Sequence, residues 1–317
     1  MLSAIDIALI ERFRKALTAL WPGDGRIGLA VSGGPDSLAM LLLAARAFPD
    51  RIEAATVDHG LRPESAAEAA MVARACESLG IAHETLAVAV EPGNIQAEAR
   101  NARYGALAAW IERRGLSALA TAHHADDQAE TLLLRLNRGS GVAGLAGVRP
   151  LGRVPGTAIP LLRPLLDWRR AELAGVVAGS GLQAVQDPSN ADPRFDRARL
   201  RLALAEVDWL DVPALASSAA NLADADVALA WAAAREWEEC VSKAPMGLAY
   251  RPRAPRAIAL RVISQIVREL DGEEPRGSAV ARLFDSLIAR QPASIGKLVA
   301  RAGSDGWTFM KAPARRA

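Results

Sequence analysis

Ile27-Gly28-Leu29-Ala30-Val31-Ser32-Gly33-Gly34-Pro35-Asp36-Ser37 is the stretch on which the architecture of this chain depends. An apolar run of strand length ends at Ser32, and residues 38–47 then have the composition of a helix. Glycines let backbone amides approach an anion, and the first turn of a helix adds unpaired N–H groups and the positive end of its dipole. The strand, the turn and the helix therefore predict a phosphate-binding loop.

The polar side chains of this loop fit a nucleotide bound together with a divalent cation. A carboxylate beside a phosphate implies a cation between them, for which Mg²⁺ is the natural choice. No lysine follows the glycines and the spacing is not G-x-G-x-x-G, so neither of those nucleotide motifs is present. The alternative is an ordinary strand–turn–helix with a glycine cap. The predicted nucleotide-binding residues are Ser32, Gly33, Gly34, Pro35, Asp36 and Ser37, with Asp36 as the metal ligand.

Further apolar strands follow, and helical segments separate them. Strands are expected at residues 52–57, within 81–90 and at 116–122, with helices at 3–20, 64–79, 94–114 and 168–180. This alternation predicts an α/β fold, a Rossmann-like parallel sheet with helices on both faces. We expect residues 1–205 to form this domain. Residues 206–317 are expected to form an acidic helical linker and a small, mostly helical C-terminal domain.

Chemically active side chains gather where the predicted strands end. Because ligands of parallel sheets bind at the carboxyl ends of the strands, Asp58 and His59 are further candidates for the nucleotide pocket. A denser cluster, Thr121-Ala122-His123-His124-Ala125-Asp126-Asp127-Gln128-Ala129-Glu130, lies at the next such junction. Acids in a first helical turn can be simple caps. Metal ligation by His123, His124 and these acids is disfavoured because no H-E-x-x-H spacing is present.

Arginines provide candidate contacts to an anionic substrate. Arg100 and Arg103 share a helix face, Arg135 and Arg138 follow the acidic cluster, and Arg194, Arg197, Arg199 and Arg201 follow a turn-rich loop at residues 187–193. Residues 251–317 hold thirteen basic and six acidic residues, whereas residues 206–240 hold eight acidic residues and one basic residue. This asymmetry favours a polyanion such as RNA as partner. Solvated arginines, or arginines paired with the acidic segment, are the alternative.

Composition excludes several classes of protein. Of the 317 residues, 51% are hydrophobic and 23% are charged, which is typical of a globular chain. The two cysteines, Cys76 and Cys240, are too few and too far apart for a disulfide framework or a C-x-x-C redox site. No apolar run is long enough to span a bilayer and no secretory pattern is present, so we expect a cytoplasmic protein without membrane contact.

Taken together, these motifs resemble one family, the tRNA(Ile)-lysidine synthetases of the N-type ATP pyrophosphatase (PP-loop) superfamily. The loop S-G-G-P-D-S indicates only the superfamily. The more specific pieces are Val57-Asp58-His59-Gly60-Leu61-Arg62, Ala99-Arg100-Asn101-Ala102-Arg103-Tyr104, the run from Thr121 to Gly147, Arg163-Pro164-Leu165-Leu166 and Asp187-Pro188-Ser189-Asn190. The resemblance covers about residues 25–202.

The resemblance implies a two-step ligation. ATP would adenylate the carbonyl oxygen at position 2 of the wobble cytidine in an isoleucine tRNA with a CAU anticodon, and L-lysine would then displace AMP. Asp36, Asp126, Asp127 and Glu130 are the catalytic candidates. His123, Arg100, Arg103, Arg135, Arg138 and the arginines from Arg194 to Arg201 are candidates for tRNA or lysine binding. Long members of the family carry two further domains, so the C-terminal part here resembles a shorter form.

Three alternatives compete with this interpretation. Another PP-loop enzyme such as a tRNA thiolase would commonly need a pair of cysteines, and Cys76 and Cys240 do not form one. A glutamine-dependent amidating synthetase would need an amidotransferase domain as its ammonia source. A catalytically dead tRNA-binding protein is disfavoured because the loop retains every position of its motif.

Overall fold

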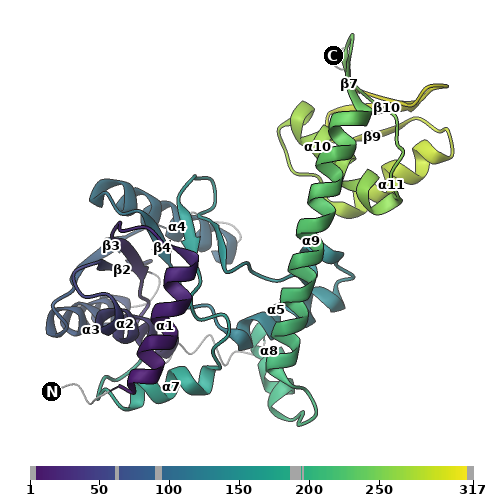
Figure 1. Cartoon of the computed structure of the whole chain (residues 1–317). Coiled ribbons are helices and arrows are strands. Elements are labelled where there is room, and N and C mark those ends of the chain that lie inside the picture. Colours follow the sequence, from purple (N-terminus) through teal and green to yellow (C-terminus); the bar gives the residue numbers. More distant parts are fainter. Residues whose placement is uncertain (1–4, 61–63, 90–94, 186–193, 195, 313–317) are drawn as a thin grey trace. The chain divides into compact units, whose positions relative to one another are not determined.

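The computed structural model describes residues 5–60, 64–89, 95–185, 194 and 196–312. The chain divides into two compact units, Met1–Ala223 and Asp224–Ala317, and the division falls within one long helix (Figure 1). Among the described residues, no helix is both long and apolar enough to cross a bilayer.

The first unit has a six-stranded sheet in the order β3-β2-β1-β4-β6-β5, parallel except for β5. Its strands are β1 (Ile27–Ala30), β2 (Ile52–Asp58), β3 (Ala82–Ala87), β4 (Ala118–Ala120), β5 (Leu151–Arg153) and β6 (Pro160–Leu162). Its helices are α1 (Ile7–Leu20), α2 (Pro35–Ala47), α3 (Ser65–Ser78), α4 (Ile95–Arg114), α5 (Ala125–Asn137), α6 (Val142–Leu145), α7 (Arg170–Ala178) and α8 (Asp196–Ala205). The expected parallel α/β fold is confirmed.

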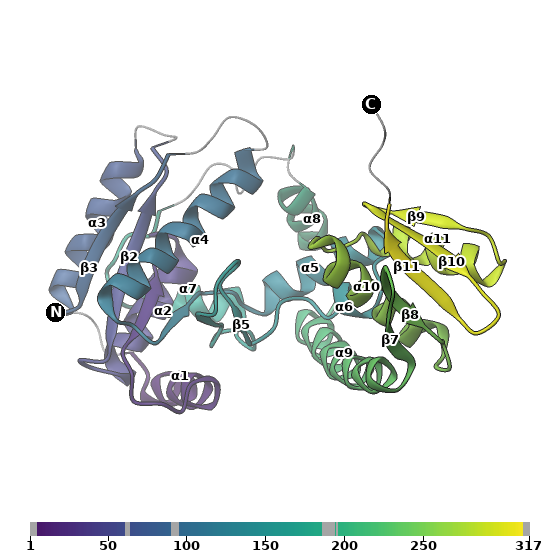
Figure 2. The ribbon, with the colours of Figure 1, turned by 90° about the horizontal axis from the view of Figure 1, so that it is seen from above.

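Helices cover both faces of this sheet, and the short strand β1 shows why. Ile27 and Leu29 belong to a core that α1, α2, α3 and α7 share on one face. Gly28 faces α4 on the other, where a Cβ atom would lie 2.4 Å from Ile111 and 2.5 Å from Trp110. Figure 2 shows α3 and α4 on opposite sides of β2 and β3. Glycine at this position therefore allows α4 to approach the sheet closely.

The strand order brings two loops together at one edge of the sheet. Strand β1 pairs with β2 on one side and β4 on the other, and Leu29 lies opposite both Ala54 and Ala120. The chain order reverses between β1 and β4, which is the topological switch point where ligands of open α/β sheets bind. The loop after β1 and the cluster after β4 therefore meet at their carboxyl ends.

The second unit joins helices to a second sheet. Helix α9 (Val212–Cys240) leads into an antiparallel sheet ordered β7-β8-β11-β10-β9. The strands are β7 (Val241–Ala244), β8 (Gly247–Tyr250), β9 (Ala293–Ile295), β10 (Leu298–Ala302) and β11 (Trp307–Lys311), and the helices are α10 (Arg256–Asp271) and α11 (Gly277–Ile288). Helices α10 and α11 supply the helical content that the sequence predicts for this part of the chain. The five-stranded sheet gives this unit more strand content than the expected mostly helical domain has. Its strands were not predicted because the alternation of apolar and polar residues in 241–250 and 293–311 is too short to be recognised without the neighbouring strands.

Candidate active site

The glycine-rich loop after β1 is held open by its own residues. Gly33 has φ +85°, a conformation that disfavours a side chain. The Ser37 hydroxyl donates to the Gly34 carbonyl at 3.0 Å, accepts from the Ser32 amide at 3.1 Å and lies 3.2 Å from the Ser32 hydroxyl. Ser37 is buried, so it shapes the loop rather than facing solvent.

Helix α2 begins at the end of this loop without a side-chain cap. Gly34 is the N-cap and Pro35 occupies the first turn, a position where the missing proline N–H costs nothing. Because a glycine cap offers no acceptor to the first amides of the helix, those amides and the helix dipole are available to an anion. This is the arrangement that the sequence predicts for a phosphate loop.

Across the switch point, His124 connects the two loops. It is the N-cap of α5, where the Asp127 amide donates to His124 Nδ1 at 3.4 Å and the His124 amide donates to Asp127 Oδ2 at 3.2 Å. In the neutral ring this cap assigns the hydrogen to Nε2, which lies 3.4 Å from Asp36 Oδ2 and 3.6 Å from Asp127 Oδ2. Asp36, His124 and Asp127 therefore form one cluster from two separate strand ends.

The acids of this cluster act on the pKa of His124. Burial lowers its pKa, but the contact with Asp36 and the charges of Asp127 and Asp36 outweigh burial, so the net shift is upward. Asp36 Oδ1 is buried and has no hydrogen-bond partner among the described residues. One carboxylate oxygen at the phosphate loop is thus available to a ligand.

The other two acids of the α5 cluster are engaged by arginines. Asp126 accepts from the Arg170 amide at 2.8 Å and from Arg169 Nε at 3.3 Å; burial raises its pKa, but these hydrogen bonds lower it overall. Glu130 is 2% exposed and accepts from Arg170 at 2.9 Å and from Arg201 at 2.6 Å. Asp127 is therefore the member of the predicted trio that lies next to Asp36.

A second group of side chains, all cationic or aromatic, gathers at the same edge of the sheet. Arg100 and Arg103 of α4 lie over the Tyr104 ring, 5.0 and 5.2 Å from its centre. Burial lowers the pKa of Arg103, and burial together with Arg103 lowers that of His59. Burial is also the main cause that lowers the pKa of Arg163, which follows β6.

His123 lies among these arginines. Burial lowers its pKa to about 4, and Arg163, Arg103 and Arg100 contribute, while Asp127 acts in the opposite direction. His123 is therefore neutral near pH 7, with Nδ1 3.0 Å from the Thr121 hydroxyl. Arg163 is buried and Arg103 is partly buried, while Arg100 is exposed. Guanidinium groups brought close together with partial burial are unfavourable without an anion, so this group fits the charged part of a substrate.

The structure brings together most of the predicted site residues. The loop residues, Asp36, Asp127 and His123 lie at the ends of β1 and β4. Asp58 accepts from the Gly60 amide at 2.9 Å and so shapes the turn after β2, while His59 Nδ1 is buried without a partner among the described residues. Residues 61–62 and 187–190, part of the motifs quoted above, lie outside the described residues.

The remaining predicted arginines lie farther along α5, on α8 and, for Arg194, just before α8. Arg138 and Arg199 pair with Asp196, and Arg201 pairs with Glu130, so these three use acids of their own unit rather than the acidic segment of residues 206–240. Sequence reasoning missed Arg163 as a site residue, placed Tyr104 on the helix face of Arg100 and Arg103 without a role of its own, and considered His124 only as a metal ligand. Arg163 could have been found because it ends an apolar run, Ile159–Leu162, at the same sheet edge.

Comparison with known proteins assigns the class. Residues 7–207 match the PP-loop domain family, which uses ATP. The U34-tRNA thiolase NcsA from Methanococcus maripaludis, solved with its [4Fe-4S] cluster, has a TM-score of 0.53 over 68% of this chain and 78% of that chain. Its sequence identity is 16%, so this likeness concerns the fold alone.

Closer relatives assign the family. A tRNA(Ile)-lysidine synthase from Novosphingobium aromaticivorans is 49% identical over 310 residues, covering 96% of this chain and 94% of the relative. One from Zymomonas mobilis is 39% identical over 302 residues, covering 93% and 91%. The chain belongs to the tRNA(Ile)-lysidine synthase family.

Proposed function

We propose that this enzyme ligates L-lysine to position 2 of the wobble cytidine in an isoleucine tRNA with a CAU anticodon. The observation that carries the proposal is the meeting of the phosphate loop with the His124–Asp127 cluster at 3.4 Å from Asp36, in a chain of this family. ATP is the cosubstrate, and AMP and pyrophosphate are the products. The tRNA substrate places the reaction in the cytoplasm.

In the first step, the cytidine carbonyl oxygen attacks the α-phosphorus of ATP and pyrophosphate leaves. The phosphates can be held by the amides at the start of α2 and by Arg100, Arg103 and Arg163. The neutral His123 lies beside these arginines. Fixed donors aimed at developing negative charge stabilise such a transition state without reorganisation. Adenylation converts a poor leaving oxygen into AMP.

In the second step, the amine of lysine attacks carbon 2 and AMP leaves. The incoming ammonium must first lose a proton, and Asp127 is the best-placed acceptor because it lies at the switch point beside His124, and its contact with an arginine, 3.9 Å to Arg201, is longer than those of Asp126 and Glu130. Asp126 and Glu130 would act by positioning Arg169, Arg170 and Arg201, which keeps α5, α7 and α8 in register around the site.

Asp36 fits a Mg²⁺ ion bound together with ATP. Its buried Oδ1 has no partner among the described residues, and within the same residues no group of three or more His, Cys, Asp or Glu side chains could hold a metal. Mg²⁺ is usually held by one or two carboxylates and by substrate phosphates, so a single acid at a phosphate loop is sufficient. The ion would neutralise charge on the departing pyrophosphate.

The rival functions lack support. Cys76 and Cys240 are both buried and belong to different units, so nothing favours a thiolase built on paired cysteines. The loop and its acid are intact, which disfavours a tRNA-binding protein without activity. Release of AMP in the presence of tRNA would distinguish the enzyme from such a protein.

One assay tests the proposal directly. Purified protein is incubated with ATP, Mg²⁺, radiolabelled lysine and transcripts of isoleucine tRNA carrying either CAU or GAU as the anticodon. We expect labelled lysine in the CAU transcript only, with one AMP released per lysine. Absence of label in the CAU transcript, with ATP bound normally, would contradict the proposed function.

A further inference from the structure

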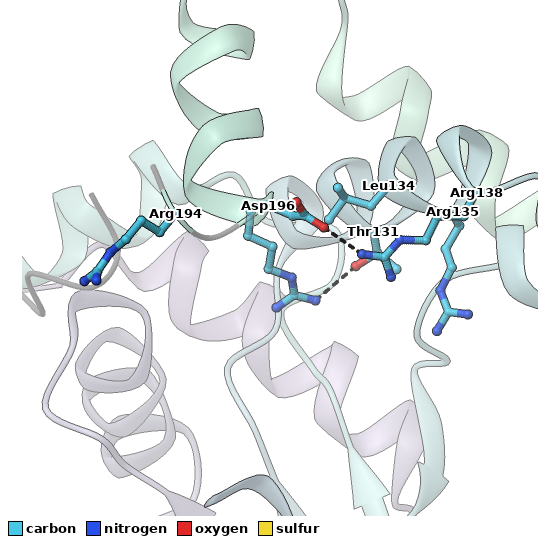
Figure 3. A pocket seen from close by; sticks show the side chains of 7 residues that line it. Thr131, Leu134, Arg135, Arg138, Arg194 and Asp196 are labelled. Carbon is cyan, nitrogen blue, oxygen red and sulfur yellow. Dashed lines mark hydrogen bonds and ion pairs between the residues drawn. The ribbon is translucent and has the colours of Figure 1, made fainter. Parts of the chain in front are cut away.

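A basic pocket lies between α5 and α8, on the part of α5 that follows the acidic cluster. Its volume is about 470 Å³, and it is lined by Thr131, Leu134, Arg135, Arg138, Arg194, Asp196 and Arg197 (Figure 3). All of these residues belong to the first unit. The pocket therefore has four guanidinium groups and one carboxylate in its lining.

The single carboxylate does not neutralise this pocket. Asp196 accepts from Arg138 at 2.8 Å and from Arg199 at 2.9 Å, and all three side chains are about half exposed or more. Arg135 has no carboxylate within ion-pair distance among the described residues, and Arg197 reaches only the Thr131 hydroxyl, at 3.4 Å. The pocket therefore carries an excess of positive charge. Its one carboxylate, Asp196, already forms ion pairs with two arginines.

The adjacent turn of the same helix shows the contrast. There Asp126, Asp127 and buried Glu130 lie within ion-pair distance of Arg169, Arg170 and Arg201, so three acids balance three arginines. Exposed ion pairs such as Arg138–Asp196 contribute little stability, so an external anion can replace Asp196 at small cost. Arginine forks and a threonine hydroxyl are donors that match phosphate oxygens.

We propose that this pocket binds consecutive phosphodiester groups of the tRNA backbone, away from the reacting nucleotide. Figure 3 shows Arg194 well apart from Arg135 and Arg138, so the charge extends along the pocket rather than converging on one point. A chain of phosphates can contact such a row, whereas one small anion cannot. This inference rests on the proposed function, because it takes tRNA as the substrate.

The test uses the full-length protein and compares single-charge variants. In Arg135→Gln and Arg197→Gln we expect tRNA affinity to fall about tenfold each at low salt, the usual effect of losing a charged hydrogen bond. The slope of log affinity against log salt should flatten by about one per arginine removed. ATP affinity should be unchanged. Arg74→Gln, on exposed α3 surface, is the matched control and should behave like the unaltered protein.

A variant in the opposite direction sharpens the test. Asp196→Asn removes the competing carboxylate and frees Arg138 and Arg199, so tRNA should bind more tightly and with a steeper salt dependence. Melting temperatures of all variants establish that each is folded. Inorganic phosphate, titrated against the unaltered protein and the double variant Arg135→Gln/Arg197→Gln, separates a free anion from the RNA backbone as the ligand.

The outcomes distinguish this pocket from the proposed function. If the unaltered protein incorporates lysine but the double variant retains tRNA affinity and salt slope, the pocket proposal is wrong. If the double variant loses only inorganic phosphate binding, the site belongs to a free anion and the RNA assignment is overturned. Failure of the unaltered protein to incorporate lysine contradicts the function itself, whatever the variants do in tRNA binding.

Discussion

At the scale of single residues, Asp36 and His124 show how one contact can serve both loop geometry and chemistry. His124 caps α5 through Nδ1 and directs Nε2 at Asp36, so rotating the ring for either role would disturb the other. Asp36 in turn has one oxygen toward His124 and one buried oxygen without a partner among the described residues. That second oxygen is where we expect the metal ion to bind.

Replacing Asp36 by Asn tests this assignment. The amide keeps the shape but loses the charge, so ATP binding should no longer strengthen when Mg²⁺ is added, and lysine incorporation should fall by at least about a hundredfold. Calorimetric titration of ATP with and without Mg²⁺ measures the first effect. Asp24→Asn, in an exposed loop, is the control. Unchanged Mg²⁺ dependence in Asp36→Asn would exclude Asp36 as the ligand.

His123 should make the stability of the protein depend on pH. Its pKa is about 4 in the folded chain against 6.5 as the ordinary value. The unfolded chain therefore binds the proton first, and the free energy of unfolding falls as pH drops from 6.5 toward 4, by about 3 kcal/mol for this group. Urea unfolding of the unaltered protein and His123→Gln should show a smaller acid loss in the variant. Equal losses would contradict the assignment.

At the scale of the element, α5 separates its tasks by turn. Its first turn holds His124 and Asp127 at the switch point, its second turn holds buried Glu130, and its last turns carry Arg135 and Arg138 toward the basic pocket. Residues three and four apart are neighbours on a helix, so Asp127 and Glu130, and then Thr131, Arg135 and Arg138, follow one another along it, and the tasks are separated by position along the helix. One helix thus connects the catalytic cluster with the proposed backbone contacts.

Glu130→Gln distinguishes a positioning role from a catalytic one. Because Glu130 is 2% exposed while Arg170 and Arg201 are only partly buried, losing its charge should lower the free energy of unfolding by about 2 kcal/mol. Turnover at low temperature, where the variant is fully folded, should fall less than tenfold. Glu112→Gln, exposed on α4, is the control. Full stability with turnover abolished would instead make Glu130 catalytic.

At the scale of the whole molecule, the second unit has a core of its own. Trp307 packs edge-on against Tyr250 and Phe284, with ring centres 5.8 and 5.5 Å apart. Glu236 of α9 accepts from the amides of Arg253 and Ala254 at 2.7 and 3.1 Å and so fixes the segment that leads into α10. These contacts all lie within Asp224–Ala317.

We therefore expect a fragment of residues 224–317 to fold alone. Circular dichroism should show cooperative thermal unfolding, and the near-ultraviolet signal of the tryptophans should disappear in the same transition. Phe309→Ala in the fragment, which removes a side chain that is 1% exposed, should lower its stability by about 3 kcal/mol or more. A fragment that lacks a cooperative transition would show that its stability depends on the first unit.

The sequence alone predicted the parallel fold and the loop, since both depend on local signals. Apolar runs, helical spacing and glycines at a strand end are readable without knowing which strands are neighbours. The helices at 7–20, 65–78 and 95–114 are confirmed nearly at their predicted limits. The domain boundary near Ala205 stays a prediction. The sequence placed Asp36 and His124 at the same edge of the sheet, but it did not predict the contact between them.

Which acids face that edge was decided by the tertiary structure. Asp126, Asp127 and Glu130 are equivalent in sequence, but Asp126 pairs with Arg169 and Glu130 with Arg170 and Arg201, whereas Asp127 lies beside His124 with only a longer contact, 3.9 Å, to Arg201. Arg163 and Tyr104 likewise join the site only because β6 and α4 lie next to β4. The physical reason is that pairing between side chains depends on distance in space, and residues 40 to 88 apart along the chain, such as Glu130 with Arg170 and Asp36 with His124, become neighbours only when the sheet forms.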